Sequence, residues 1–203
     1  MDVVTQSKWD KAAANFDLMA GFGPEKRWLP YKQKLFGNMG DGDILFLAVG
    51  TGLDIPAFPE GRNIMGIDIS QKMLDVAADR AANYSGKLAL QQADVHDLPF
   101  ADEQFDQVFT SCTFCSVPNP IGGLRALQRV LKPGGDLYMF EHTGSRYYPF
   151  KPMMNLMTVV SRKLGPDMNR PTVENVVAAG YELQKVTHVY MDVVKTIHAV
   201  KAN

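Results

Sequence analysis

A glycine-containing segment, Val49-Gly50-Thr51-Gly52, directly follows the apolar run Ile44 to Ala48. Glycine lets the backbone approach a ligand closely, and open α/β sheets bind ligands beyond the carboxyl ends of their strands. A loop that holds a dinucleotide pyrophosphate carries a third glycine three residues after the second, and that position here is Ile55. The segment therefore predicts a ligand contact but weighs against NAD or FAD. An ordinary glycine turn is the alternative.

Two carboxylates follow later predicted strands. Asp68 ends the apolar run after Asn63 and stands 18 residues after Gly50, a separation at which an acid can accept both ribose hydroxyls of a nucleoside. Asp94 follows the next strand and can accept from the amino group of an adenine, with Val95 beside the ring. The alternatives are a solvated acid at a strand end and a polar loop acid.

A third polar group follows the fifth predicted strand and consists of Glu141, His142, Tyr147 and Tyr148. A carboxylate with aromatic rings suits a cationic or partly cationic amine. The alternative is that Glu141 and His142 only form hydrogen bonds with the neighbouring loop.

The elements that position these groups alternate between strands and helices. Helices are predicted over 2–20 and 24–37, over 70–82 with Ser70 as the cap, and over 119–131 and 172–179. Strands are predicted over 44–48, 63–67, 87–91, 104–110 and 136–141, with a turn at 132–135. Such alternation favours a mostly parallel sheet. The last strands, 181–190 and 193–201, have a connection so short that they must pair antiparallel, which is unusual for a dehydrogenase.

A basic segment covers roughly residues 145–165. Between Thr143 and Pro166 it carries four cations and no acid, and its apolar residues share one helical stripe. This pattern predicts a basic amphipathic helix on an anionic membrane surface, or else a helix whose stripe packs on the core. The N-terminal helix with Trp9 and Phe16 allows the same two interpretations, membrane contact or closure over a bound ligand.

Composition limits the remaining classes of function. The chain has 203 residues, 46% of them apolar, and a net charge of −1, which favours one globular domain over 1–203 and no nucleic-acid partner. No apolar run approaches the roughly 20 residues that cross a bilayer, and no secretory signal is recognisable, so a cytoplasmic location is expected. Cys112 and Cys115 form a single C-x-x-C, which favours reduced thiols; no metal site is expected.

In their order and spacing, the glycine loop, Asp68, Asp94 and the turn Lys132-Pro133-Gly134-Gly135 resemble the class I S-adenosylmethionine (SAM)-dependent methyltransferases over nearly the whole chain. The resemblance implies a Rossmann-like α/β fold: a seven-stranded, mostly parallel sheet with an antiparallel C-terminal hairpin strand and extra N-terminal helices. It implies SAM as cofactor and S-adenosylhomocysteine as product.

By the same resemblance, Asp68 holds the ribose of SAM. The methionine part meets Ala48, Val49, Gly50, Thr51, Gly52 and Ser111, and the adenine meets Ile69, Met73, Asp94 and Val95. This chain departs from the family pattern at two positions: Phe46 replaces an acid common in the first strand, and Ala48 replaces a glycine. The amino group of SAM then relies on backbone carbonyls or on another residue.

The segments Leu47–Gly52 and Glu141–Ser145 more closely resemble bacterial phospholipid N-methyltransferases of the Rhodobacter type, which are similar to the ubiquinone and menaquinone C-methyltransferases. That resemblance implies stepwise methylation of phosphatidylethanolamine to phosphatidylcholine by a peripheral protein. Its partners would be the phospholipid substrate and the anionic cytoplasmic face of the inner membrane, with no obligate protein partner.

On this interpretation Arg146 or Lys151 holds the lipid phosphate, and Tyr31, Tyr147 and Tyr148 face the headgroup amine. Glu141 or His142 takes its proton. One alternative is a methyltransferase for a small hydrophobic acceptor such as a quinone carbon, a thiol or a free amine. A second is a non-catalytic module that binds SAM or a membrane.

Overall fold

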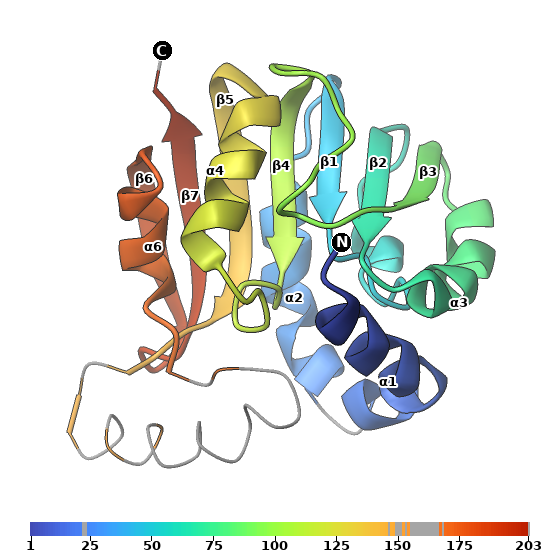
Figure 1. The fold of residues 1–203 in the computed structure, drawn as a ribbon, viewed down its shortest axis with the longest axis horizontal. Coiled ribbons are helices and arrows are strands. Elements are labelled where there is room, and N and C mark those ends of the chain that lie inside the picture. The colour runs from blue at the N-terminus through green and yellow to red at the C-terminus, as the bar shows by residue number, and fades with distance from the viewer. Residues whose placement is uncertain are drawn as a thin grey trace.

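A seven-stranded sheet in the order β3-β2-β1-β4-β5-β7-β6 forms the centre of the computed structural model (Figure 1). The structure describes residues 1–21, 24–145, 147, 148, 152, 154, 167 and 169–202. The strands are β1 (Asp43–Leu47), β2 (Asn63–Asp68), β3 (Lys87–Gln92), β4 (Phe105–Ser111), β5 (Leu131–His142), β6 (Tyr181–Tyr190) and β7 (Val194–Lys201).

The predicted sheet is confirmed. Strands β1 to β5 pair in parallel, whereas β7 pairs antiparallel with both β5 and β6. Strand order reverses between β1 and β4, so the connections that follow these two paired strands lead to opposite sides of the sheet and leave room for a ligand.

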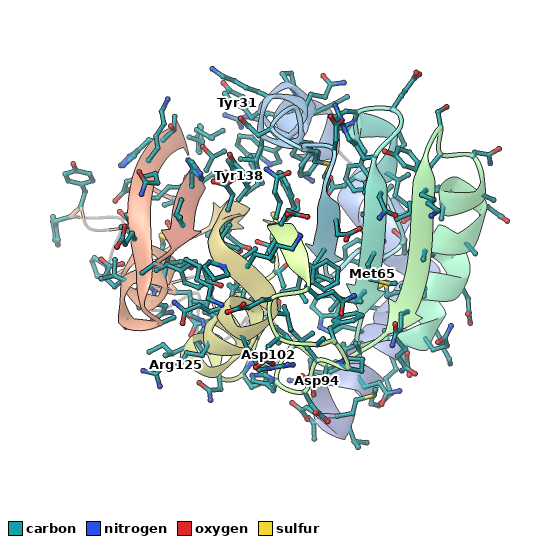
Figure 2. All side chains as sticks on the ribbon, turned by 90° about the horizontal axis from the view of Figure 1, so that it is seen from above. Tyr31, Met65, Asp94, Asp102, Arg125 and Tyr138 are labelled. Atoms are coloured by element: carbon teal, nitrogen blue, oxygen red, sulfur yellow. The ribbon has the colours of Figure 1, made fainter. Side chains whose placement is uncertain are left out.

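Helices cover both faces of the sheet. Helices α2 (Pro24–Phe36) and α3 (Gln71–Ala82) contribute Phe36 and Ala77 to an apolar cluster with Phe46, while α4 (Pro120–Val130) and α6 (Thr172–Ala178) contribute to the cluster on the other face. Figure 2 shows this division, with Tyr31 of α2 and Arg125 of α4 on opposite sides of the sheet. Apolar side chains alternate along the strands between these two cores, because successive residues of a strand point to opposite faces.

Helix α1 (Val3–Gly21) lies across the carboxyl ends of the parallel strands (Figure 1). It matches the predicted helix over 2–20. The predicted basic insertion at 145–165 lies almost wholly outside the described residues. Within the described parts of the chain, no helix is long and apolar enough to span a membrane.

Two local features differ from the predictions. The predicted turn at 132–135 is instead a bulge inside β5. Phe105 pairs with Leu131 and Gln107 pairs with Asp136, so a step of two residues along β4 corresponds to a step of five along β5. A short 3-10 helix, η1 (Ile55–Ala57), follows the glycine loop where no element was predicted. The predicted cap is confirmed, because the Ser70 hydroxyl accepts a hydrogen bond from the Met73 N–H.

We expect the two glycines of the loop to differ in their tolerance of alanine. Both have positive φ, +58° at Gly50 and +84° at Gly52, but an added Cβ meets nothing within 4 Å at Gly50. At Gly52 it would lie 2.8 Å from Ile55 Cδ1 and 3.2 Å from Ala77 Cβ. Gly50→Ala should therefore lower the free energy of unfolding by about 1–2 kcal/mol, the cost of a left-handed residue. Gly52→Ala should lower it by about 3–4 kcal/mol, since overpacking adds to that cost.

Urea denaturation of both variants without ligand measures this difference. Equal losses in the two variants would contradict the packing argument and leave backbone conformation as the only effect.

Candidate active site

A cleft lies at the carboxyl ends of β1, β2 and β4, and side chains of α1 line part of it. Ten of the eleven residues predicted to contact the cofactor line it, which are Ala48, Val49, Gly50, Thr51, Asp68, Ile69, Met73, Asp94, Val95 and Ser111. Gly52 does not line the cleft and instead packs against Ile55 and Ala77. The structure thus brings together groups from five separate stretches of the sequence.

Asp68 connects the glycine loop to the start of α3. One carboxylate oxygen accepts from the Gly50 N–H at 2.9 Å, and the other accepts from the Ser70 N–H at 2.9 Å. Burial raises the pKa of Asp68, and these backbone hydrogen bonds act in the opposite direction. The carboxylate is therefore held in one orientation at the wall of the cleft.

Asp94 stands at the far end of the cleft, beside the start of α1. Its carboxylate accepts from the Asp2 N–H at 2.7 Å and from the N–H and Nδ1 of His96, both at 2.9 Å. Burial raises the pKa of Asp94, but the hydrogen bonds from His96 and Asp2 outweigh that effect and keep it below its ordinary value. Asp94 is therefore an ionised acceptor at neutral pH.

Helix α1 forms a roof that is tied to the loops beneath it. The carboxylate of Asp10 accepts from the Ser70 hydroxyl, and that of Asp17 accepts from the Thr51 hydroxyl and from Arg80 Nη2. The rings of Trp9 and Phe16, 6.2 Å apart, line the cleft. Trp9 and Phe16 therefore lie where closure over a ligand, one of the two interpretations of the N-terminal helix, would place them.

The structure corrects the expected position of Glu141. Its side chain is fully buried, does not line the cleft, and accepts hydrogen bonds from the Thr110 hydroxyl at 2.8 Å and from the N–H groups of Thr113 and Phe114 at 3.1 Å. Burial raises the pKa of Glu141 to about 7. The carboxylate binds the loop after β4, so it does not face an acceptor amine.

The other described residues that were predicted to meet the acceptor do not line the cleft either. His142 is half-buried. Its pKa is lowered mainly by burial and, to a smaller extent, by the positive charge of Lys195. Tyr147 and Tyr148 are 66% and 87% exposed. Tyr31 lies 6.5 Å from the Trp28 ring on the side of the sheet that α2 covers (Figure 2), and Arg146 and Lys151 lie outside the described residues.

Several residues that line the cleft were not predicted from the sequence. Lys32 of α2 reaches the cleft and donates to Asp54 at 2.8 Å. Asp54 could have been predicted from its position two residues after the glycine loop. No sequence pattern predicts that Lys32 reaches the cleft. Cys112 lines the cleft with φ +53°, and the two cysteines of the C-x-x-C are free thiols. Burial raises the pKa of the Cys115 thiol to about 12, so this cysteine is unreactive.

We expect Glu141 to make stability depend on pH. Its pKa is about 7 in the folded chain against an ordinary value of 4.5, so the folded state holds the proton more tightly than the unfolded state. The contribution of Glu141 to the free energy of unfolding is then fully present below about pH 4.5 and is lost as the pH rises to about 7. Between about pH 5 and pH 8 the wild type should lose about 2 kcal/mol more than Glu141→Gln does.

Urea denaturation at several pH values measures this difference. The matched control is Glu182→Gln, an exposed acid on β6, which should follow the wild type. Parallel curves for the wild type and Glu141→Gln would show that Glu141 does not titrate in this range.

Comparison with known proteins agrees with this geometry. A family model described as a methyltransferase domain matches residues 45–139. The chain is 33% identical over 155 residues to a ubiquinone/menaquinone biosynthesis C-methyltransferase UbiE of Geotalea daltonii, covering 72% of this chain and 66% of that protein. To the protein of the same name from Geobacter sp. strain M21 it is 30% identical over 168 residues, covering 78% and 72%.

A solved structure shares the fold. The putative methyltransferase in complex with the Trm112 methyltransferase activator of Haloferax volcanii superposes with a TM-score of 0.73 and 19% identity, covering 96% of this chain and 98% of that one. The family match runs from β1 into β5, so it includes the glycine loop, Asp68 and Asp94 that meet at the cleft. The chain therefore belongs to the class I methyltransferases, which take their methyl group from S-adenosylmethionine.

Proposed function

We propose that this chain methylates a ring carbon of an amphiphilic acceptor of the quinone class. The observation that carries this proposal is the similarity, over 72% and 78% of the chain, to two proteins named as ubiquinone/menaquinone biosynthesis C-methyltransferases. The chain spans 66% of the length of the first of these. The acceptor and the lipid environment are therefore proposals, whereas the use of SAM is a property of the family.

The residues at the cleft fit the chemistry of SAM. Asp68 offers an oriented carboxylate for the ribose hydroxyls, and Asp94 offers an ionised acceptor for the adenine amino group. The Ser111 hydroxyl is buried at the cleft with no partner among the described residues, as expected for a group that a ligand satisfies. When bound, SAM supplies a methyl group that its positive sulfonium activates.

Part of the cleft wall is apolar and can contact the ring of such an acceptor. Trp9, Phe16, Leu53 and Val117 contribute apolar surface, and the carboxylate predicted to meet an amine, Glu141, is buried elsewhere. A ring at the hydroquinone level becomes nucleophilic at carbon when a neighbouring hydroxyl loses its proton. That carbon forms the new bond to the methyl group, the bond from the methyl group to sulfur breaks, and the ring carbon then releases its proton.

The contribution of the chain to this reaction is to position the ring and to exclude water. Two reactants held in a near-attack geometry react far faster than free ones, and a closed site keeps competing solvent away. Helix α1 serves both purposes, because its aromatic side chains line the cleft while its acids bind the loops below.

A lipid acceptor would reach the cleft from a membrane surface. Apolar side chains of α1 are exposed at this end of the molecule, among them Val3 at 71%, Val4 at 67% and Leu18 at 62%. Such residues would insert into the headgroup region of a bilayer. We therefore retain peripheral association with the cytoplasmic face of the membrane as part of the proposal.

Phosphatidylethanolamine is the second candidate acceptor. The segment Glu141–Ser145 carries the resemblance to phospholipid N-methyltransferases, and the exposed Tyr147 and Tyr148 follow it at the same end of β5. Aromatic faces of this kind bind methylated ammonium groups well.

One assay distinguishes the two acceptors. Purified chain with methyl-labelled SAM is offered liposomes that contain a prenylated hydroquinone without its ring methyl group, or liposomes that contain phosphatidylethanolamine. We expect label in the hydroquinone and at least about 10-fold less in the phospholipid. Label in mono-, di- and trimethylated phospholipid alone would overturn the quinone proposal in favour of the second candidate.

Asp68→Ala is the control for both arms. It removes the carboxylate at the wall of the cleft and should abolish labelling of either acceptor, so label that persists in this variant comes from a contaminant. Label in neither acceptor, from wild-type chain that still binds S-adenosylhomocysteine, would exclude both candidate acceptors and keep the cofactor assignment.

A further inference from the structure

The amino-acid end of SAM carries two opposite charges, a carboxylate and an ammonium group, and a cleft that binds it should contain a partner for each. Among the described residues that line the cleft, Lys32 is the only lysine or arginine. The acids that line it are Asp2, Asp54, Asp68 and Asp94. A partner for the carboxylate of the ligand is therefore found on α2, outside the sheet.

Lys32 and Asp54 form a close, shielded ion pair. Lys32 Nζ lies 2.8 Å from Asp54 Oδ1, and their side chains are only 4% and 15% exposed. Lys32 Nζ also lies 5.7 Å from the centre of the Phe140 ring. Both residues line the same cleft as the glycine loop, with Asp54 two positions after Gly52.

The other acids that line the cleft form hydrogen bonds with other partners. Asp68 is bound to the glycine loop and to the start of α3, and Asp94 with Asp2 and His96 forms a cluster at the opposite end. Asp54 is thus the acid that stands beside the cation. It precedes η1 without capping that helix through its side chain, so helix capping does not account for it.

A shielded ion pair contributes little net stability, because removing both charges from water offsets most of their attraction. An ion pair in a binding cleft is stabilised when a zwitterion binds to it, because each charge of the ligand then lies beside an opposite charge of the pair. A lysine ammonium has three donors and a carboxylate has about four acceptor positions, so both can bind a ligand without separating.

We propose that Lys32 and Asp54 together bind the amino-acid end of SAM, with Lys32 on its carboxylate and Asp54 on its ammonium group. The four charges then alternate in sign. This inference rests on SAM as the methyl donor and is independent of which acceptor is methylated. It makes the two residues determinants of cofactor specificity, because a nucleoside that lacks the amino acid has nothing to place between them.

Binding at this end also positions the reacting centre. The adenosine end is directed to Asp68 and Asp94, so fixing the opposite end stretches the ligand between two anchors. The sulfonium then lies between the glycine loop and the end of β4, where Ser111 and Cys112 line the cleft.

Calorimetry with three probes tests the proposal. The probes are S-adenosylhomocysteine, decarboxylated SAM and 5′-methylthioadenosine, which lacks both charges of the amino acid. Lys32→Met should bind S-adenosylhomocysteine about 30-fold more weakly, the typical effect of losing a hydrogen bond between charged groups. It should bind decarboxylated SAM and 5′-methylthioadenosine within about 3-fold of wild type. Asp54→Asn should weaken the first two probes and leave the third unchanged.

Two further variants keep the test interpretable. Lys34→Met removes a lysine from the exposed side of the same helix and should bind all three probes like the wild type. Lys32→Met with Asp54→Leu removes both charges at once, so neither is left buried and unpaired. The double variant should fold, and it should bind S-adenosylhomocysteine more weakly than the wild type does while its binding of 5′-methylthioadenosine stays unchanged.

Equal weakening of all three probes in the single and double variants would show that the ion pair only supports the fold and would overturn the proposal. Unchanged binding of S-adenosylhomocysteine would overturn it as well. Failure of the wild type to bind any probe would instead contradict the assignment of the cofactor.

Discussion

The carboxylate of Asp68 is the constraint on which the rest of the site depends. Its two oxygens accept from Gly50 in the glycine loop after β1 and from Ser70 at the start of α3, so one side chain sets the distance between two loops. Ser70 in turn caps α3 and donates to Asp10 of α1. A continuous series of hydrogen bonds therefore joins the sheet, the glycine loop, the helix behind it and the roof of the cleft.

Backbone conformation shapes the rest of the cleft. Ala48, Gly50 and Gly52 have φ values of +56°, +58° and +84°, so every second residue after β1 is left-handed. Cys112, directly after β4, has φ +53°. These residues turn the chain away from the sheet directly after β1 and β4, and the non-glycine residues among them are strained. Such strain is found where function requires the backbone to take a particular path.

The fold could be predicted from the sequence because each strand and helix carries its own periodic pattern and the connections leave few topologies. The glycine loop, Asp68 and Asp94 could be placed because they occupy strand ends, which parallel pairing gathers at one edge. Glu141 also ends a strand, yet position at an edge does not say whether a side chain enters the cleft or the core. Its three hydrogen bonds to Thr110, Thr113 and Phe114 depend on the neighbouring strand, which no local pattern reveals.

Lys32 and the acids of α1 could not be predicted for a related reason, since their roles depend on how a helix packs on a distant loop. The contact between Asp2 and Asp94 shows the consequence for binding. The carboxylate that is suited to an adenine amino group already accepts from the backbone of the roof, at 2.7 Å. Because a carboxylate has about four acceptor positions, ligand and roof can share it, and each then helps to orient it for the other. On the proposed cofactor assignment Asp94 contacts both the nucleoside and α1, so we expect the N-terminal helix to contribute to cofactor affinity.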